Sequence, residues 1–555
     1  MLPLPNGKRH WHANRETRAP HCGLSLPLSL VGRGGGWGAA HYSRGAGMIR
    51  PLASLLALAL LALVIAPLVA VAVRGAGVSL GPADWAAVRF TVMQAVLSAL
   101  ISTVLAIPVA RALARQRFMG RGVLVTLMGA PFLLPAVVAV LGLLAVFGRS
   151  GLLNSGLEAL GLPPVSIFGL EGVLLAHVFL NLPLAVRMIL QGWLSIPAER
   201  IRLAQSLGFG PNQMLRHLEA PMLREVLPGV ALVILVICLT SFAVVLTLGG
   251  GPAATTIELA IYQAVRFDFD LARAAGLAGV QVLICTLAAV AAWVLVRPAG
   301  FGAGLDRQTP IPAPGGWRRV ADIAALTAAT LFLILPLLAV TFRGLPGLTD
   351  LPASVLPAAL RSIVVALTSA ILTTAAALVL ALVAARKPSP LVEAAATLPL
   401  ATSGLVLGTG LFLIVQPFTP PMTVALPVTI LVNSALTLPF LYRILLPQTR
   451  ALLADYGRLA DSLGLKGWSR LRWLVLPRLA RPLGFGAGIA AALSMGDLGA
   501  IALFAGERQA TLPLVVQQLT GAYRIEAAAS ASLILVVLSF ALFWACDAGG
   551  RRVAA

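Results

Sequence analysis

Charged residues are scarce in this chain of 555 residues, because Asp, Glu, Lys and Arg together make up 11% of it. A typical soluble domain carries about 25%, so an ordinary soluble enzyme is excluded. Hydrophobic residues make up 59% of the chain, and its mean hydropathy is +0.93. A run of about 20 apolar residues crosses the hydrocarbon core as a helix. The long uncharged runs therefore predict an all-α polytopic membrane protein.

Lysine is also scarce, since only Lys8, Lys387 and Lys466 occur. A nucleotide-binding P-loop needs Gly-x4-Gly-Lys followed by Ser or Thr, and none of the three lysines stands in that setting. We therefore expect no enzymatic site and no cofactor on this chain. If ATP drives its function, a separate polypeptide binds the nucleotide.

Cysteine and histidine are too sparse for a metal or redox centre. None of the four cysteines stands in a Cys-x-x-Cys pair, and Cys238 and Cys285 fall within apolar runs, as buried small hydrophobic residues do. His177 is the only histidine within a predicted span, and no cysteine or carboxylate cluster accompanies it. We expect His177 to be a hydrogen-bonded helix residue.

The formal net charge is +21, which in a soluble protein would suggest nucleic acid. In a polytopic membrane protein, positive charge gathers in the cytoplasmic loops instead. With both termini inside, the cytoplasmic segments after residue 50 carry 25 Lys and Arg, and the outer segments carry nine. This predicts a multi-pass membrane protein with both termini in the cytoplasm, in contact with lipid and without a nucleic-acid partner.

The chain divides into an extension (residues 1–47), a first half (48–296), a cytoplasmic linker rich in Pro and Gly (297–320) and a second half (321–555). The extension lacks helical periodicity, so we expect it to be disordered, with Met48 as the natural start. Each half is predicted to hold six spans. Those of the first half are at 51–73, 90–110, 122–148, 172–186 (extended past Arg187), within 226–257 (which also holds the outer loop) and at 274–296; those of the second half are at approximately 321–342, 362–385, 394–416, 424–446, 483–504 and 527–546.

One stretch of the sequence occurs twice, with a constant offset of 256 residues. The first copy contains Arg202, Leu203, Ala204, Leu207, Gly208, Leu218 and Pro221, and the second contains Arg458, Leu459, Ala460, Leu463, Gly464, Leu474 and Pro477. Each copy is predicted to form a short amphipathic helix, a turn and a second helix, because its leucines four residues apart give one apolar helix face. Each glycine suits the position after a helix end, and each proline the start of the next span. Both copies fall on the cytoplasmic side, so the halves are predicted to be parallel repeats.

This stretch resembles the EAA motif of ABC-importer permeases, Glu-Ala-Ala-x3-Gly-x9-Ile-x-Leu-Pro. The resemblance implies the type I ABC importer permease fold, in which this loop docks on a dimeric ATPase subunit. Both copies depart from the motif, because Arg202 and Arg458 stand where the family has Glu, and Ala220 replaces Leu. Two other interpretations stay open from the residues alone: a helix lying on the lipid headgroups, or a plain helical hairpin.

Asp497 interrupts the eleventh predicted span, and its partner at the repeat offset is Ser241. An ionisable residue inside a membrane span is a candidate functional residue. The two residues are therefore candidates for a translocation path that binds a cation. The alternative is that Asp497 caps a helix broken near Gly496 and Gly499.

The segment from Ser241 to Gln281 is similar to the permease subunits of bacterial thiamine ABC importers, and the resemblance extends over about residues 50–546. It implies import of thiamine and its phosphates, with a separate ATPase and a periplasmic solute-binding protein as partners. Glu258, Asp268 and Asp270 are placed on the outer side, where they either meet that binding protein or form a solvated loop. Import of ferric iron or another small solute, and a secondary transporter, remain as alternatives.

Overall fold

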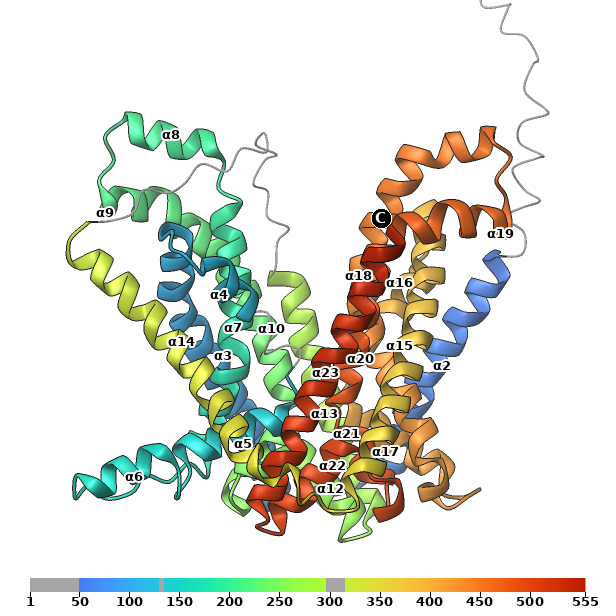
Figure 1. The fold of residues 1–555 in the computed structure, drawn as a ribbon. Helices are drawn as coiled ribbons and strands as arrows, with labels where there is room; N and C mark the ends of the chain where they lie inside the picture. Colours follow the sequence, from blue (N-terminus) through green and yellow to red (C-terminus); the bar gives the residue numbers. More distant parts are fainter. Residues whose placement is uncertain (1–48, 129–133, 296–314, 555) are drawn as a thin grey trace, which may run out of the picture. The chain divides into compact units, whose positions relative to one another are not determined.

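The computed structural model describes residues 49–128, 134–295 and 315–554, which belong to one compact unit, Met48–Ala555. The predicted extension 1–47 and most of the linker 297–320 lie outside the described residues. Every regular element of the described part is helical (Figure 1). Eleven helices, or twelve if one bent pair counts as a single span, are long and apolar enough to cross a membrane. The prediction of an all-α polytopic membrane protein is confirmed.

The elements of the first half are α2 (Ile49–Gly75), α3 (Pro82–Arg115), α4 (Arg121–Leu127), α5 (Ala136–Phe147), α6 (Leu152–Ala159), α7 (Leu170–Leu194), α8 (Ala198–Ser206), α9 (Pro211–Met214), η2 (Leu215–Glu219), α10 (Ala220–Leu239), α11 (Ala243–Leu248), η3 (Pro252–Ala254), α12 (Ile257–Arg266) and α13 (Leu271–Leu295).

The elements of the second half are α14 (Trp317–Gly344), η4 (Pro346–Leu348), α15 (Val355–Arg386), α16 (Pro390–Thr397), η5 (Leu398–Ala401), α17 (Gly404–Val415), η6 (Pro421–Val424), α18 (Ala425–Ser462), α19 (Gly467–Arg470), η7 (Leu471–Val475), α20 (Leu476–Met495), α21 (Gly499–Phe504), η8 (Glu507–Gln509), α22 (Leu512–Gly521) and α23 (Ile525–Ala554).

Two predicted spans are not single helices. The span expected at 394–416 is broken, because Pro390–Ala401 and Gly404–Val415 meet at an angle of 103°. Ser403 lies at the break, and its hydroxyl accepts a hydrogen bond from the backbone of Val406, which caps the new helix. In the first half, α4 and α5 cover the span expected at 122–148 as two separate helices. A few polar residues and prolines are enough to break a helix. They lower the mean hydropathy of an apolar run too little for the break to be recognised from the sequence.

From α9 to α11 the repeat is reproduced element by element in α19 to α21. α10 and α20 begin and end at positions 256 residues apart, and so do α11 and α21. Even an uncommon feature is duplicated, since the π-helical turns η2 and η7 stand immediately before α10 and α20. Single-turn π-helices are rare and often occur at functional sites. Because the two π-helical turns occupy equivalent positions, we interpret the segment before α10 and α20 as part of the duplicated structure.

A hydroxyl group connects equivalent helices in each half. The Thr91 hydroxyl of α3 accepts a hydrogen bond of 2.9 Å from the backbone N–H of Ile257, the first residue of α12. The Ser362 hydroxyl of α15 does the same at 2.8 Å for Leu512, the first residue of α22. Both hydroxyls satisfy a backbone donor that a helix start leaves free. The two halves therefore share tertiary contacts as well as helix order.

The first long helix of each half packs against the other half. α2 packs on α17 as well as on α13 of its own half, while α14 packs on α5 as well as on α23. The crossings use equivalent residues, with Gly410 against Pro67 and Gly142 against Pro336. Each half therefore contributes one helix to the packing of the other, and the two form a single body.

Candidate functional site

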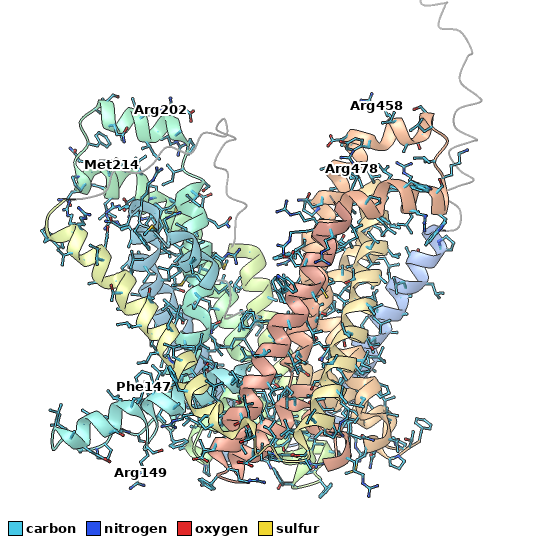
Figure 2. All side chains as sticks on the ribbon, viewed as in Figure 1. Phe147, Arg149, Arg202, Met214, Arg458 and Arg478 are labelled. Atoms are coloured by element: carbon cyan, nitrogen blue, oxygen red, sulfur yellow. The ribbon has the colours of Figure 1, made fainter. Side chains whose placement is uncertain are left out.

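The two copies of the repeated stretch form two loops, which we call loop A (residues 198–221) and loop B (residues 454–477). Figure 2 shows Arg202 and Met214 of loop A at the same end of the unit as Arg458 of loop B and its neighbour Arg478. Phe147 and Arg149 lie at the opposite end. The structure thus places both loops at one end, as parallel repeats require.

Each loop turns at its glycine in the same way. Gly208 has φ +68° and Gly464 has φ +67°, in the left-handed region that favours glycine. The amide of Phe209, one residue on, donates to the Ala204 carbonyl at 2.9 Å, and the amide of Leu465 to Ala460 at 2.9 Å. These are Schellman turns, so the predicted role of both glycines after the helix end is confirmed.

The leucines of both loops point away from the protein. Leu203 and Leu207 are 60% and 62% exposed, and Leu459 and Leu463 are 53% and 66% exposed. Ala204 and Ala460 are buried on the inner side. Exposed leucines four residues apart form an apolar ridge, and such ridges fit into a groove on another protein. Two such ridges in matching positions are a candidate interaction surface.

The two loops differ in how they leave the membrane domain. In loop A, α8 is a separate helix after the break at Ser195–Pro197, as the sequence predicted. In loop B, the corresponding residues are the last turns of α18, which runs without interruption over 38 residues. The prediction of a separate short helix is wrong there. Arg202 and Arg458 are exposed in both, and the 3.5 Å pair of Arg202 with Glu199 contributes little in water.

The second part of each loop leads back into the membrane domain. Leu218 and Leu474 lie in the π-helical turns and are partly buried. Pro221 and Pro477 are the second residues of α10 and α20, where a helix start does not use the missing N–H. Their predicted position at the entry to the next span is confirmed.

Loop A is held by a buried ion cluster that the sequence analysis missed. The carboxylate of Glu219, at the end of η2, accepts a hydrogen bond from Arg111 at 2.8 Å and a second from Arg115. Both arginines stand at the end of α3, one helical turn apart. Glu219 and Arg115 are buried. The signal was present in the sequence, since an acidic residue interrupts the apolar motif and two arginines stand four residues apart at the end of an earlier span.

Loop B is held by apolar contacts at the corresponding place. Val475 stands where loop A has Glu219, and it is buried in a cluster with Leu452 and Leu479. Counted back from the last residues of α3 and α15, Leu382 occupies the position that Arg111 has in the first half. Leu382 packs on the same cluster. Loop B is also braced within itself by the ion pair between Arg470 and Asp461 at 2.8 Å. Equivalent loops are therefore anchored by different chemistry.

The structure does not join the two candidate path residues to each other. The Ser241 hydroxyl bonds to His177 at 2.7 Å, and the other ring nitrogen of His177 bonds to Ser98 at 3.0 Å. His177 is thus a hydrogen-bonded helix residue, as predicted. Asp497 lies at the break between α20 and α21, where its carboxylate accepts the N–H of Gly499 at 3.2 Å. Asp497 thus bonds to the first amide of α21 from the residue before its N-cap, Leu498, which is close to the capping role that the sequence offered as the alternative.

The expected exposed position of Glu258 is wrong. Glu258 is only 1% exposed, because α12 packs it against α13 and α17. Gln281 donates to its carboxylate at 3.3 Å. Burial raises the pKa of Glu258 to about 7, against the smaller opposing effect of hydrogen bonds from Ser403 and Gln281. A short segment between two long spans carries too little pattern to show which of its sides is buried.

The other two acidic residues of this segment do lie in an exposed loop. Arg273 bonds to Asp268 at 3.0 Å, and the backbone N–H of Arg273 donates to the Asp270 carboxylate at 2.9 Å. The guanidinium of Arg273 also bonds to the buried Asp84 at the start of α3, at 2.8 Å. This loop is thereby tied to its own half.

A duplicated helical membrane unit with exchanged first helices and one apolar loop per half at the same end has the architecture of an ABC importer permease. No family model matches the chain, but known proteins do.

The thiamine transport system permease protein ThiP of Brucella abortus (strain 2308) is 39% identical over 520 residues, which cover 90% of this chain and 95% of the relative. ThiP of Escherichia coli (strain K12) is 40% identical over 476 residues, 83% of this chain and 88% of the relative. ThiP of Haemophilus influenzae is 34% identical over 471 residues. The chain belongs to the family of thiamine transport system permease proteins.

Proposed function

We propose that this chain is the membrane-spanning permease subunit of an ATP-driven importer that moves thiamine and its phosphates across the bacterial inner membrane. The name of its relatives supports the cargo, since similarity extends over 90% of the chain. The observation that carries the mechanism is the pair of loops A and B, with their exposed leucine ridges at one end of a single helical body. The chain itself needs no cofactor, because its partner binds the ATP.

Loops A and B are proposed to dock on a dimer of ABC ATPase subunits. Leu207 and Leu463 would enter a groove on each ATPase, while Arg202 and Arg458 stand at the rim. The rigid glycine turns hold each ridge in a fixed direction. A movement of the ATPase dimer would then be transmitted to α10 through η2 and to α20 through η7. The two halves would rock against each other and open the translocation path alternately to the two sides of the membrane.

The opposite end is proposed to face the periplasm and to receive a solute-binding protein, with both termini in the cytoplasm. The excess of Lys and Arg in the segments on the side of loops A and B supports this orientation. Cargo selection would then depend largely on the binding protein. Ferric iron or another small solute is the alternative cargo, and a secondary transporter is the less favoured alternative class.

The test is ATP hydrolysis by the complex of permease and ATPase in lipid nanodiscs with its binding protein. We expect thiamine to stimulate hydrolysis, and the double variant Leu207→Asp, Leu463→Asp to abolish the stimulation by preventing docking. Val553→Asp is the matched control, because Val553 is 65% exposed at the end of α23 and lies outside both loops. Stimulation by ferric iron alone would replace the cargo, whereas absence of any co-purifying ATPase would overturn the class of transporter.

A further inference from the structure

The first half carries a hairpin that the second half lacks. We call residues 151–168 the α6 hairpin, since it consists of α6 and the segment that returns to α7. Gly142 and Gly410 are equivalent at an offset of 268 residues, whereas Pro183 and Pro439 are equivalent at 256. The first half therefore has 12 more residues between these points. In the second half only the short turn η6 occupies the place.

The α6 hairpin is a built structure. α6 ends in a Schellman turn, with Gly161 at φ +71° and the amide of Leu162 donating to the Leu157 carbonyl at 2.9 Å. The buried side chain of Asn154 closes the hairpin, since it donates to the carbonyls of Gly148 and Val165, each at 2.9 Å, and accepts the Val165 amide at 2.8 Å. These bonds fix which face of α6 points outward.

One face of α6 is apolar. Leu153, Leu157 and Leu160 recur at helical spacing, while Ser155 and Glu158 lie on the opposite side of α6. The large apolar side chains of the hairpin that stand exposed are Leu152 at 56%, Leu153 at 42%, Leu160 at 76%, Leu162 at 50%, Val165 at 57% and Phe168 at 48%. Contiguous apolar surface of this kind is rare on a protein face that meets only water.

The position of the hairpin indicates what covers this face. α6 follows directly on α5, forms with it one stretch that is long and apolar enough to cross a membrane (Ala136–Ala159), and lies at the end opposite to loops A and B (Figure 1). Arg149 stands at its base (Figure 2), and Arg343 of α14 donates to the Ser150 carbonyl at 2.8 Å. Long arginine side chains beside the end of an apolar stretch reach toward the headgroup level. The hairpin thus continues an apolar stretch that suits lipid and has arginines beside it.

We propose that the α6 hairpin lies in the headgroup region of the membrane and anchors the first half to lipid. Amphipathic helices at such interfaces bury their apolar face about 5–10 Å deep. A soluble binding protein is the less favoured occupant, because α6 points sideways, away from α12 and α22, which lie between the two halves at this end (Figure 1). A partner that delivers solute to both halves must reach that central region instead.

The experiment uses nitroxide spin labels on the full chain in nanodiscs with its ATPase. Leu153→Cys and Glu158→Cys are compared in a background in which the four native cysteines are replaced by alanine. The two positions lie on opposite faces of the same helix, so each is the control for the other. Power saturation measures the accessibility of each label to oxygen, which concentrates in lipid, and to a water-soluble nickel chelate.

We expect the label at position 153 to be accessible to oxygen and protected from nickel, and the label at position 158 to show the reverse. Equal nickel accessibility at both positions would overturn the proposal, since the helix would then stand in water. Protection of position 153 only after the binding protein is added would overturn it as well and assign the face to that protein. Leu160→Cys, on the same face, replaces Leu153→Cys if the latter fails to assemble.

Discussion

A methyl group placed on Gly410 of α17 would lie 2.4 Å from the backbone oxygen of Pro67 in α2. The same relationship joins Gly142 of α5 and Pro336 of α14, at 2.8 Å. In both pairs the first helix of one half lies against the third span of the other. Only glycine permits backbones to approach so closely, and small residues at such crossings are typical of packing between membrane helices.

We therefore expect Gly410→Ala to destabilise the protein by about 1–3 kcal/mol, because the added methyl group overpacks a backbone contact. Gly142→Ala should behave alike. Gly279→Ala is the control, since Gly279 lies within α13 and has no heavy atom within 4 Å of the added group. Thermal unfolding in detergent measures the difference. Equal melting temperatures for Gly410→Ala and Gly279→Ala would show that the two helices are not in this contact.

In the ion cluster below loop A, substitution of the buried Glu219 should cost more stability than substitution of the partly exposed Arg111. Glu219→Gln leaves the buried Arg115 without a counter-charge, and breaking a buried ion pair costs about 3–5 kcal/mol. Arg111→Gln should cost less, because Arg111 is partly exposed and the contact between Arg115 and Glu219 remains. Melting temperature and thiamine-stimulated ATP hydrolysis are the two readouts. The interpretation fails if both variants lose the same stability.

Glu258 should make the stability of the protein depend on pH. Its folded pKa of about 7 lies above the ordinary value of 4.5, so the folded protein binds the proton more tightly than the unfolded chain. This contribution is complete below pH 4.5 and is lost as the pH rises through 7, at a cost of about 3 kcal/mol.

Glu258→Gln should therefore melt at a higher temperature than the natural protein at pH 8 and at the same temperature near pH 4.5. Thermal unfolding across this range measures the difference. Asp268→Asn is a suitable control, because Asp268 lies in the exposed loop. An unchanged difference at both pH values would show that Glu258 stays charged throughout.

Asp497 should act as a helix cap rather than as a charge on the translocation path. Asp497→Ala removes the acceptor for the Gly499 amide and should cost about 1 kcal/mol, as the loss of a helix cap does. Asp497→Asn retains an acceptor, so we expect normal stability and normal thiamine uptake. An Asn variant that melts normally but no longer transports would place the carboxylate on the path.

Much of this protein could be predicted from its sequence. Composition indicated the membrane class, and the offset of 256 residues predicted the parallel halves and the turns at Gly208 and Gly464. These features depend on local pattern, namely hydropathy, helical spacing and the backbone freedom of glycine. The role of loops A and B as ATPase-docking surfaces, and that of Ser241 and Asp497, stay predictions.

Tertiary structure alone decided the rest. The exchange of α2 and α14 between the halves, the 103° break before α17 and the burial of Glu258 all depend on which distant residues come together. Hydropathy shows that a segment is apolar, but lipid and protein interior are equally apolar, so it does not show which helix a span meets. The sequence by itself determined that the chain is helical, duplicated and embedded in a membrane, whereas tertiary packing determined which helices contact each other.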